Sequence, residues 1–164
     1  MGVMRSAFFV LMITLALVAS MSAQKTKPAD FYGEEPFRNR TAIPNAAISA
    51  LQNDKNFTDC WNFVPFEATS VDLNRDGVKE LLIKSSCGNS ATSYSFWILA
   101  RRGRTFKPVF FTATMAIYIG NKKVKGYPDI SASGCTANTC FFQDFSFNGD
   151  EYILKREWTR PNDD

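Results

Sequence analysis

Residues 72–83 read DLNRDGVKELLI, and this stretch decides both the candidate site and the expected fold around it. Oxygen-bearing side chains occupy alternate positions, a glycine follows the third, and a further carboxylate comes three residues later. Ca²⁺ prefers about six to eight oxygen ligands on a flexible loop, and this spacing provides them. Gly77 suits the sharp turn, because glycine adopts positive φ at little cost. The predicted ligands are the side chains of Asp72, Asn74 and Asp76, the backbone carbonyl of Val78, and Glu80, directly or through a water.

The same loop also has a metal-free interpretation, because Asp and Asn side chains close tight turns by bonding to the backbone. Arg75 and Lys79 flank the acidic side chains and reduce their attraction for a cation. We therefore expect weak binding, with a Kd of about 10⁻⁴–10⁻³ M, as in extracellular calcium modules. The expected role of the ion is structural, since it would neutralise repulsion among the carboxylates and fix the register of the flanking strands.

The residues around the loop predict strands on both sides of it. An EF-hand requires flanking helices and a carboxylate at loop position 12, where this chain has Ile83. Pro65, with the aromatic and β-branched residues near it, favours strands over residues 60–66 and 68–72. The apolar run that follows the loop predicts a strand over residues 80–86. Glu80, at loop position 9, then replaces the missing ligand at position 12.

The rest of the chain predicts a succession of short strands and turns. Strands are expected over residues 94–100, 106–111, 115–119 and 127–133, with turns at residues 101–104 and at Gly120-Asn121. A final hairpin turns at Asn148-Gly149. One of its faces is expected to carry Phe141, Phe145, Phe147, Tyr152, Leu154 and Trp158. The expected fold class is mainly β (α+β), an antiparallel meander of about 7–9 strands with one short N-terminal helix.

The helix is predicted over residues 44–53. Pro44 suits a first helical turn, and Ala47, Ile48 and Leu51 then share one face, which we expect to pack on the core. The preceding residues 24–42 are polar and contain two prolines, so a flexible leader is expected there. The predicted organisation is a single β-rich domain over residues 43–160, followed by a tail over residues 161–164.

Residues 1–23 have the layout of a secretory signal peptide, which predicts a secreted or periplasmic protein. A start containing Arg5 precedes an apolar run over residues 7–18, and small residues ending at Ala23 offer a cleavage site. A transmembrane helix needs about 20 apolar residues, so an uncleaved anchor is the less favoured alternative. The net charge of +3 argues against an extended nucleic-acid surface, and no membrane contact is expected after cleavage.

The chain contains four cysteines, and an even number behind a signal peptide predicts two disulfides. The short separation of Cys135 and Cys140 favours a local bridge across a turn. Cys60 would then pair with Cys87 around the loop, although three pairings remain open on sequence alone. A zinc site is the competing interpretation, but the chain has no CxxC pair and no histidine.

The sequence offers little for catalysis. Without histidine, the usual general base and the Ser–His and Cys–His pairs are absent. The best-spaced acids belong to the loop, while Asp129 and Asp144 are isolated, so we expect no enzyme. The basic turn at residues 101–104 is interpreted as a solvated hairpin tip. The aromatic residues Trp61, Trp97 and Trp158 are interpreted as core rather than as a sugar-binding platform.

The segment DLNRDGVKELLI resembles the calcium loop of FG-GAP and VCBS repeats, the integrin-alpha type of β-propeller blade. In that family a D-x-[DN]-x-D-G-x-x-[DE] loop joins two strands, so the resemblance implies Ca²⁺ bound by the five predicted ligands and strands arranged as one or two blades. Residues 126–130, GYPDI, resemble the end of a second loop. Its acidic positions are replaced by Asn121, Lys122, Lys123 and Lys125, so we expect no ion there. A propeller needs at least about four blades, more than this chain can build.

Two functions follow as hypotheses. The first is a secreted non-catalytic domain with a structural calcium loop that binds an extracellular or periplasmic protein or a cell-surface polymer. The alternative is a secreted inhibitor or immunity-type protein against an extracellular or periplasmic hydrolase, with its affinity in the Cys135–Cys140 loop or the 88–93 loop. Loss of binding with a chelator would favour the first. A hydrolase is a third option, and the oligomeric state is left open.

Overall fold

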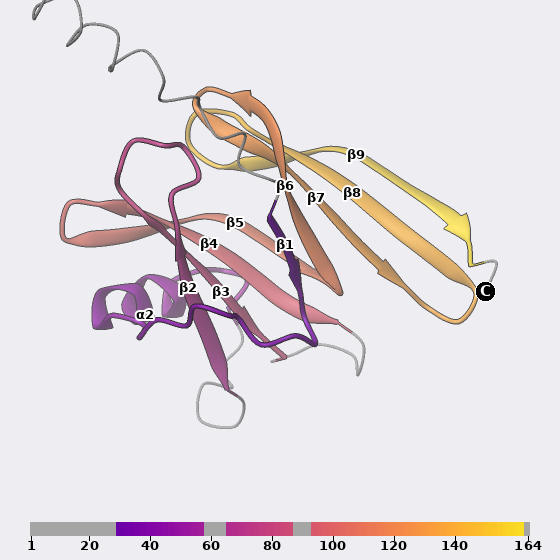
Figure 1. Cartoon of the computed structure of the whole chain (residues 1–164), viewed down its shortest axis with the longest axis horizontal. Coiled ribbons are helices and arrows are strands. Elements are labelled where there is room, and N and C mark those ends of the chain that lie inside the picture. Colours follow the sequence, from indigo (N-terminus) through magenta and orange to yellow (C-terminus); the bar gives the residue numbers. More distant parts are fainter. Residues whose placement is uncertain (1–28, 58–64, 87–92, 163–164) are drawn as a thin grey trace, which may run out of the picture.

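A computed structural model of the chain describes residues 29–57, 65–86 and 93–162, which form two antiparallel sheets and one helix (Figure 1). The central sheet has the order β2-β3-β4-β5, and the outer sheet has the order β1-β6-β7-β8-β9. Each sheet therefore contains a four-stranded meander, and the predicted mainly β fold class is confirmed. The elements are β1 (Ala29–Tyr32), α2 (Asn45–Gln52), β2 (Phe66–Val71), β3 (Glu80–Ser85), β4 (Tyr94–Arg102), β5 (Thr105–Thr114), β6 (Ala116–Val124), β7 (Tyr127–Cys135), β8 (Thr139–Phe147) and β9 (Tyr152–Pro161).

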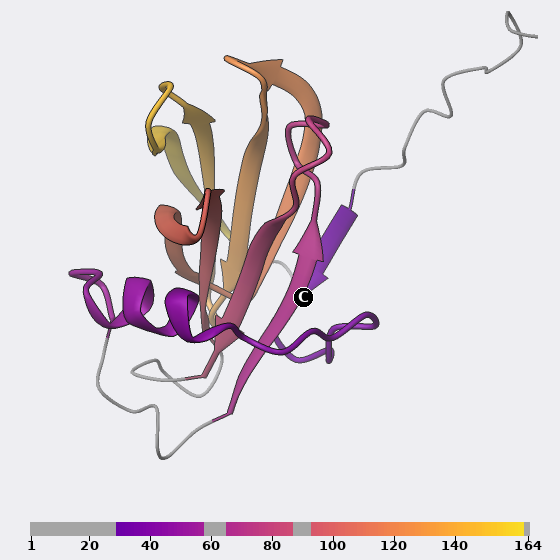
Figure 2. The same cartoon turned by 90° about the vertical axis from the view of Figure 1, so that its left-hand side faces the viewer.

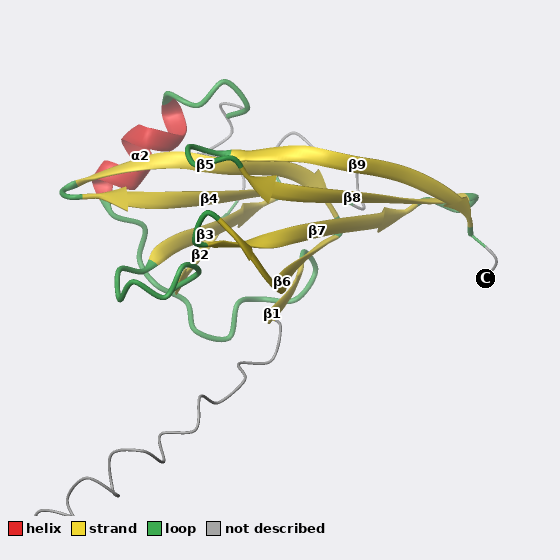
Figure 3. Cartoon of the chain, turned by 90° about the horizontal axis from the view of Figure 1, so that it is seen from above, coloured by secondary structure: helices red, strands yellow, loops and turns green. Residues whose placement is uncertain are grey.

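The helix and the two sheets form three layers, with the central sheet in the middle (Figures 2 and 3). One face of the central sheet packs on the outer sheet, where Phe96 and Ile98 meet Ile130 of β7. The opposite face, including Trp97 and Leu99, packs on the helix. Because both faces of β3 and β4 are covered, these strands are continuous buried runs rather than alternating ones.

The helix lies where the sequence predicts it. It spans Asn45–Gln52, with Pro44 at the N-cap and Asn53 at the C-cap. Ala47 and Leu51 are fully buried against the central sheet, so the predicted packing of this face is confirmed. No helix within the described ranges is long and apolar enough to cross a membrane.

The hairpin turn predicted at Gly120-Asn121 is wrong. Strand β6 continues through these residues, and a register shift between Ile119 and Lys123 marks a bulge. The turn lies at Lys125-Gly126, where both residues have positive φ, 50° and 90°. Gly120 instead permits close approach, since a Cβ there would lie 3.0 Å from the carbonyl oxygen of Asp129.

Trp158 does not lie on the predicted face of the hairpin, because a second bulge interrupts β9. The register of β8 and β9 shifts between Asp144 and Phe145, so that Arg156 pairs with Asp144 while Leu154 pairs with Phe145. Lys155 is the extra residue, so the alternation of inward and outward side chains along the strand reverses there. Trp158 lies on the exposed face of the outer sheet and is half-buried, whereas Trp97 is buried as predicted.

The predicted flexible leader is also corrected, because its second half belongs to the fold. Strand β1 pairs with β6, and residues 33–41, here called the strap, then cross to the free edge of β2 (Figure 1). The amide of Gly33 donates to the carbonyl of Met115 at 2.7 Å, and the amide of Thr41 donates to that of Ala68 at 2.8 Å. These are backbone contacts, which explains why the polar composition of the strap did not predict them.

A buried lysine holds the strap against the central sheet. The ammonium group of Lys84 donates to the carbonyl oxygens of Tyr32, at 3.3 Å, of Gly33, at 2.8 Å, and of Glu35. Its side chain is 5% exposed and lies 3.7 Å from the carboxylate of Glu67. Burial lowers the pKa of Lys84, and the charge of Glu67 opposes that shift. Three carbonyls and one carboxylate thus compensate a charge that packing alone would exclude.

We expect Lys84→Met to destabilise the domain by about 3 kcal/mol, because it leaves buried carbonyl groups without their donor and removes one of the two cations beside Glu67. Urea denaturation of both proteins measures the change. Lys107→Met is the matched control, since Lys107 pairs with Asp150 on the surface and such pairs contribute about 0–1 kcal/mol. Equal stability of the two variants would contradict the proposed role of Lys84.

Candidate functional site

The predicted calcium loop lies between β2 and β3, as the sequence indicated. Val71 and Glu80 are the last paired residues of the two strands, so residues 72–79 form the connection. Gly77 has φ of 83°, which confirms that glycine occupies the left-handed position in the turn. Arg75 also adopts positive φ, 63°, a conformation that is uncommon outside glycine.

Side chains of the loop bond to its own backbone. Asp72 Oδ2 accepts from the amide of Gly77 at 3.1 Å, and Asn74 Oδ1 accepts from the amide of Asp76 at 2.9 Å. Asp76 Oδ1 accepts from the amide of Val78 at 2.7 Å. These bonds satisfy the metal-free interpretation of the loop, and they also orient three oxygen-bearing side chains over one short segment.

One oxygen of the loop lacks a partner. Asp72 Oδ1 is buried and makes no hydrogen bond within the part of the chain that the structure describes. An unpaired buried oxygen on a charged group is costly, and a cation is a suitable partner for it. Asn74 Oδ1 keeps a second lone pair, while Asp76 Oδ2 accepts from the side-chain Nδ2 of Asn74 at 2.8 Å. The donor set of Asp72, Asn74 and Asp76 therefore fits a hard cation, and the side chain of Val78 is 44% exposed beside it.

Glu80 lies behind the loop rather than at its open side. It is 2% exposed, and its carboxylate accepts from the amide of Leu73 and from the hydroxyl of Tyr127, each at 2.9 Å. Burial raises the pKa of Glu80, and these two hydrogen bonds oppose the shift. Burial, with the bond to Glu80, also raises the pKa of Tyr127 to about 12.

The structure therefore separates Glu80 from the other predicted ligands. No group of three acidic or cysteine side chains suited to a metal ion occurs among the described residues, so Asp72, Asp76 and Glu80 do not form one cluster. Asp72, Asn74, Asp76 and Val78 share the loop, whereas Glu80 connects its base to the outer sheet. A site here would contain two carboxylates, which agrees with an expectation of weak binding.

A lysine from the outer sheet reaches the loop. The ammonium group of Lys123 donates to the backbone carbonyl of Asn74 at 2.7 Å, across 49 residues of sequence. The sequence placed Lys123 in a second loop without an ion, and its contact with the first loop was missed. No local signal predicts it, because the bulge in β6 and the packing of the sheets determine where Lys123 lies.

The predicted bridge between Cys135 and Cys140 is confirmed as a disulfide. The two residues face each other across β7 and β8, at the end of this hairpin. Cys60 and Cys87 lie outside the described residues, as do residues 1–28 with the predicted signal peptide. Their pairing and the cleavage therefore remain predictions.

The exposed face of the outer sheet carries an aromatic pair that sequence reasoning missed. Phe142 and Trp158 stack with ring centroids 5.3 Å apart. The guanidinium of Arg156 lies 3.9 Å from the centroid of Trp158, and that of Arg160 lies 4.9 Å from that of Phe142. The alternation of Arg156, Trp158 and Arg160 along one strand was the available signal.

The isolated acids of the sequence are each bonded to a serine. Asp129 accepts from the hydroxyl of Ser146 at 2.6 Å, and Asp144 accepts from that of Ser131 at 2.7 Å. Both pairs connect β7 and β8. Each carboxylate is therefore hydrogen-bonded across the two strands within the outer sheet.

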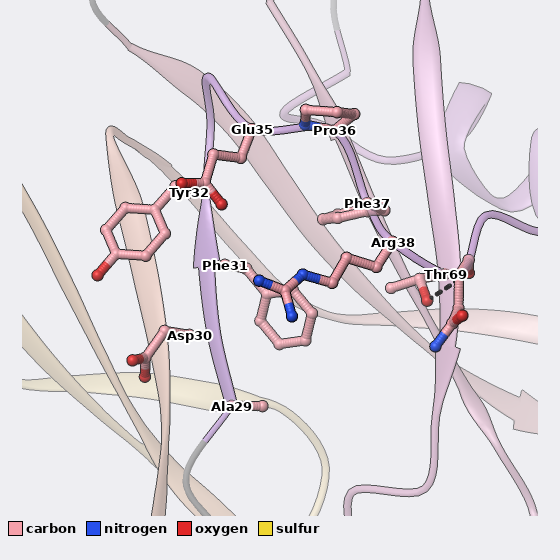
Figure 4. A pocket seen from close by; sticks show the side chains of 10 residues that line it. Ala29, Asp30, Phe31, Tyr32, Glu35, Pro36, Phe37, Arg38 and Thr69 are labelled. Carbon is pink, nitrogen blue, oxygen red and sulfur yellow. Dashed lines mark hydrogen bonds between the residues drawn. The ribbon is translucent and has the colours of Figure 1, made fainter.

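The strap and the edges of the two sheets enclose a cavity of about 420 Å³ (Figure 4). Asp30, Tyr32 and Glu35 line one side, and the side chain of Arg38 extends from the strap toward β1. Thr69 bonds to the carbonyl of Asn39 at 2.8 Å and closes the other side. The cavity follows from the path of the strap, and its polar groups do not form a recognisable catalytic arrangement.

Comparisons with known proteins found no match to any family model, curated protein or solved structure. The resemblance of residues 72–83 to FG-GAP and VCBS loops therefore remains a hypothesis about a short segment.

The buried carboxylate predicts a dependence of stability on pH. Because the pKa of Glu80 is raised above its ordinary value of 4.5, the folded protein holds this proton more tightly than the unfolded chain. The stabilisation is complete below pH 4.5 and is lost as pH rises through the raised pKa. Glu80→Gln can accept from the Leu73 amide through its carbonyl oxygen and donate from its NH₂ group to the Tyr127 hydroxyl, without the charge. In chelator, its stability relative to wild type should therefore increase between pH 4.5 and neutrality.

Chemical denaturation across this pH range measures the difference. Glu80→Leu provides the second variant, because leucine leaves the Leu73 amide and the Tyr127 hydroxyl without an acceptor. It should be about 2 kcal/mol less stable than Glu80→Gln throughout the range. A difference between wild type and Glu80→Gln that does not change with pH would contradict this account.

Proposed function

We propose that this protein is a secreted or periplasmic, non-catalytic binding domain whose β2–β3 loop binds Ca²⁺ weakly and structurally. The observation that carries the proposal is the buried oxygen of Asp72, which has no hydrogen-bond partner among the residues that the structure describes. Asp72, Asn74, Asp76 and the carbonyl of Val78 would hold the ion. Bound Ca²⁺ supplies positive charge for the carboxylates. The chain itself orients them through the amides of Gly77 and Val78.

Glu80 has a supporting role in this proposal. Its bonds to Leu73 and Tyr127 hold the base of the loop against the outer sheet. A rigid base reduces the ordering that ion binding must impose, and it transmits the state of the loop to the sheet. The partner of the domain is an extracellular or periplasmic protein or a surface polymer. The missing histidine and the serine-bonded acids favour binding over catalysis.

The disulfide hairpin end supports the second candidate, an inhibitor of an extracellular or periplasmic hydrolase. Residues 136–139 are exposed between Cys135 and Cys140, and Thr136 bonds to Thr139 across the turn at 2.8 Å. This end of the outer sheet extends away from the helix and the β4–β5 turn (Figure 1). A stapled, projecting turn is suited to insertion into an active site. This candidate requires inhibition that persists in chelator, whereas the calcium-dependent domain requires loss of binding.

Calcium should stabilise the folded domain. At about 10 mM Ca²⁺, a Kd of 10⁻⁴–10⁻³ M adds about 1–3 kcal/mol to the free energy of unfolding and raises Tm by several degrees. Calorimetry with Ca²⁺, with Mg²⁺ and with chelator measures the shift. Asp72→Asn should abolish it, and Asp150→Asn, an exposed loop acid far along the chain, should leave it intact. The same Tm in Ca²⁺ and in chelator would contradict the calcium proposal.

Removing the lysine that contacts the loop should strengthen calcium binding. Lys123→Met deletes a positive charge that donates to the carbonyl of Asn74, so the Kd for Ca²⁺ should fall about three- to tenfold at low salt. Isothermal titration measures the change. Lys122→Met removes the same charge from a neighbouring exposed residue and should have a smaller effect. Equal changes in both variants would assign the effect to net charge rather than to the contact.

A further inference from the structure

A basin of about 600 Å³ lies beside the calcium loop, on the side away from Lys123. Three segments distant in sequence enclose it: the second half of the loop, the tip of the β4–β5 hairpin, and the residues that lead into the helix. Pockets of this size accommodate a few side chains or a small ligand. Its lining includes Pro44, Val78, Lys79, Leu81, Arg101 and Phe106.

The floor of the basin is apolar. Leu81 is 4% exposed there, and Phe106 and Pro44 contribute further carbon surface. Val78 stands at the margin and is 44% exposed, which is unusual for a large apolar side chain in this structure. An exposed apolar group beside a concave apolar surface favours contact with an apolar side chain of a partner.

The margin of the basin is positively charged. Lys79 and Arg101 line it, and neither aspartate nor glutamate does. None of the ion pairs formed by the described residues includes either cation. Arg101 donates from Nε to the carbonyl of Gly103 at 3.2 Å, which holds the guanidinium at the hairpin tip. Two further exposed arginines, Arg102 and Arg104, add to the same field.

We propose that this basin binds an acidic segment of a protein partner, with an apolar side chain on the floor and carboxylates against Lys79 and Arg101. Charge complementarity selects the acidic groups, and arginine and carboxylate form strong charge-assisted hydrogen bonds. The apolar floor favours a peptide over an anionic polysaccharide, since a sugar polymer offers no aliphatic side chain to fill it. The inference rests on the proposed function as a binding domain and names its surface and the chemistry of its partner.

The basin also shares backbone with the calcium loop. Gly77 and Val78 line the basin, and their amides are the groups bonded to Asp72 and Asp76. An ion held by those carboxylates would fix the wall that the partner contacts. Coupling between two ligands is reciprocal, so Ca²⁺ should tighten peptide binding by the same factor by which peptide tightens calcium binding.

Fluorescence anisotropy with labelled eight-residue peptides tests the proposal on the mature chain. The probe alternates glutamate with leucine; one comparison peptide alternates glutamate with serine, and the other alternates lysine with leucine. Only the glutamate–leucine peptide should bind appreciably. The double variant Lys79→Gln, Arg101→Gln should weaken its binding about tenfold or more, and Val78→Ser should weaken it several-fold.

The matched control is Arg156→Gln, Arg160→Gln, which removes the same charge from β9 in the outer sheet. It should change the affinity less than about twofold. Equal loss in both double variants, equal binding of the glutamate–serine peptide, or absence of binding by the probe would overturn the proposal. Equal binding of heparin to wild type and to Val78→Ser, tighter than the probe, would identify a polyanion surface instead and would also overturn it.

The same titrations in Ca²⁺ and in chelator separate this inference from the calcium proposal. Peptide binding that follows the basin variants but ignores calcium, together with an unchanged Tm, refutes the calcium loop and supports the basin. Calcium stabilisation without discrimination among the peptides refutes the basin and leaves the calcium loop standing. Tighter peptide binding in Ca²⁺ that Asp72→Asn abolishes supports both.

Discussion

Two buried charges on one face of β3 fix the loop and the strap, which apolar packing also joins to the core. Glu80 and Lys84 lie on either side of Leu82, and they are 2% and 4% exposed. Glu80 contacts the base of the β2–β3 loop and Tyr127 of the outer sheet, while Lys84 contacts the carbonyls of the strap. Buried charges persist only where hydrogen bonds compensate them, so each fixes the segment it contacts. One strand thereby sets the position of the loop and of the N-terminal segment.

The inward position of Glu80 determines what the loop can do. The sequence pattern contains three carboxylates, yet only Asp72 and Asp76 remain on the loop, and Lys123 opposes them. Arg75, Lys79 and Lys123 together offset the charge of the two carboxylates, so any attraction for a cation is modest. The family resemblance assigns Glu80 to the ion, but this residue instead bonds to Tyr127 and connects the two sheets. A loop pattern can therefore retain its spacing while one of its residues takes a structural role.

Local signals predicted the loop between strands, the helix and the C-terminal hairpin, because each depends on residues close together in the chain. The errors in β6 and β9 occurred at bulges: β6 gains two residues relative to β7, and β9 gains one relative to β8, which exchanges its two faces. Nothing in the pattern around residues 119–123 or at Lys155 marks such a residue. The contacts of Lys84 and Lys123 span 51 and 49 residues, so they follow from the packing of distant segments. A lysine directly after Leu81-Leu82-Ile83 was nevertheless a visible sign of a buried charge.

The calcium loop and the basin beside it act on the same few atoms of backbone. Asp72 and Asp76 accept hydrogen bonds from the amides of Gly77 and Val78. A partner in the basin would contact Gly77 and Val78 from the other side. If both ligands favour the same conformation of the β2–β3 loop, each must raise the affinity of the protein for the other. Under the proposed function, this coupling would give weak binding a role, because a site with a Kd of about 10⁻⁴–10⁻³ M would change its occupancy at extracellular calcium concentrations. A tighter site would stay filled, and partner affinity would then no longer follow the surroundings.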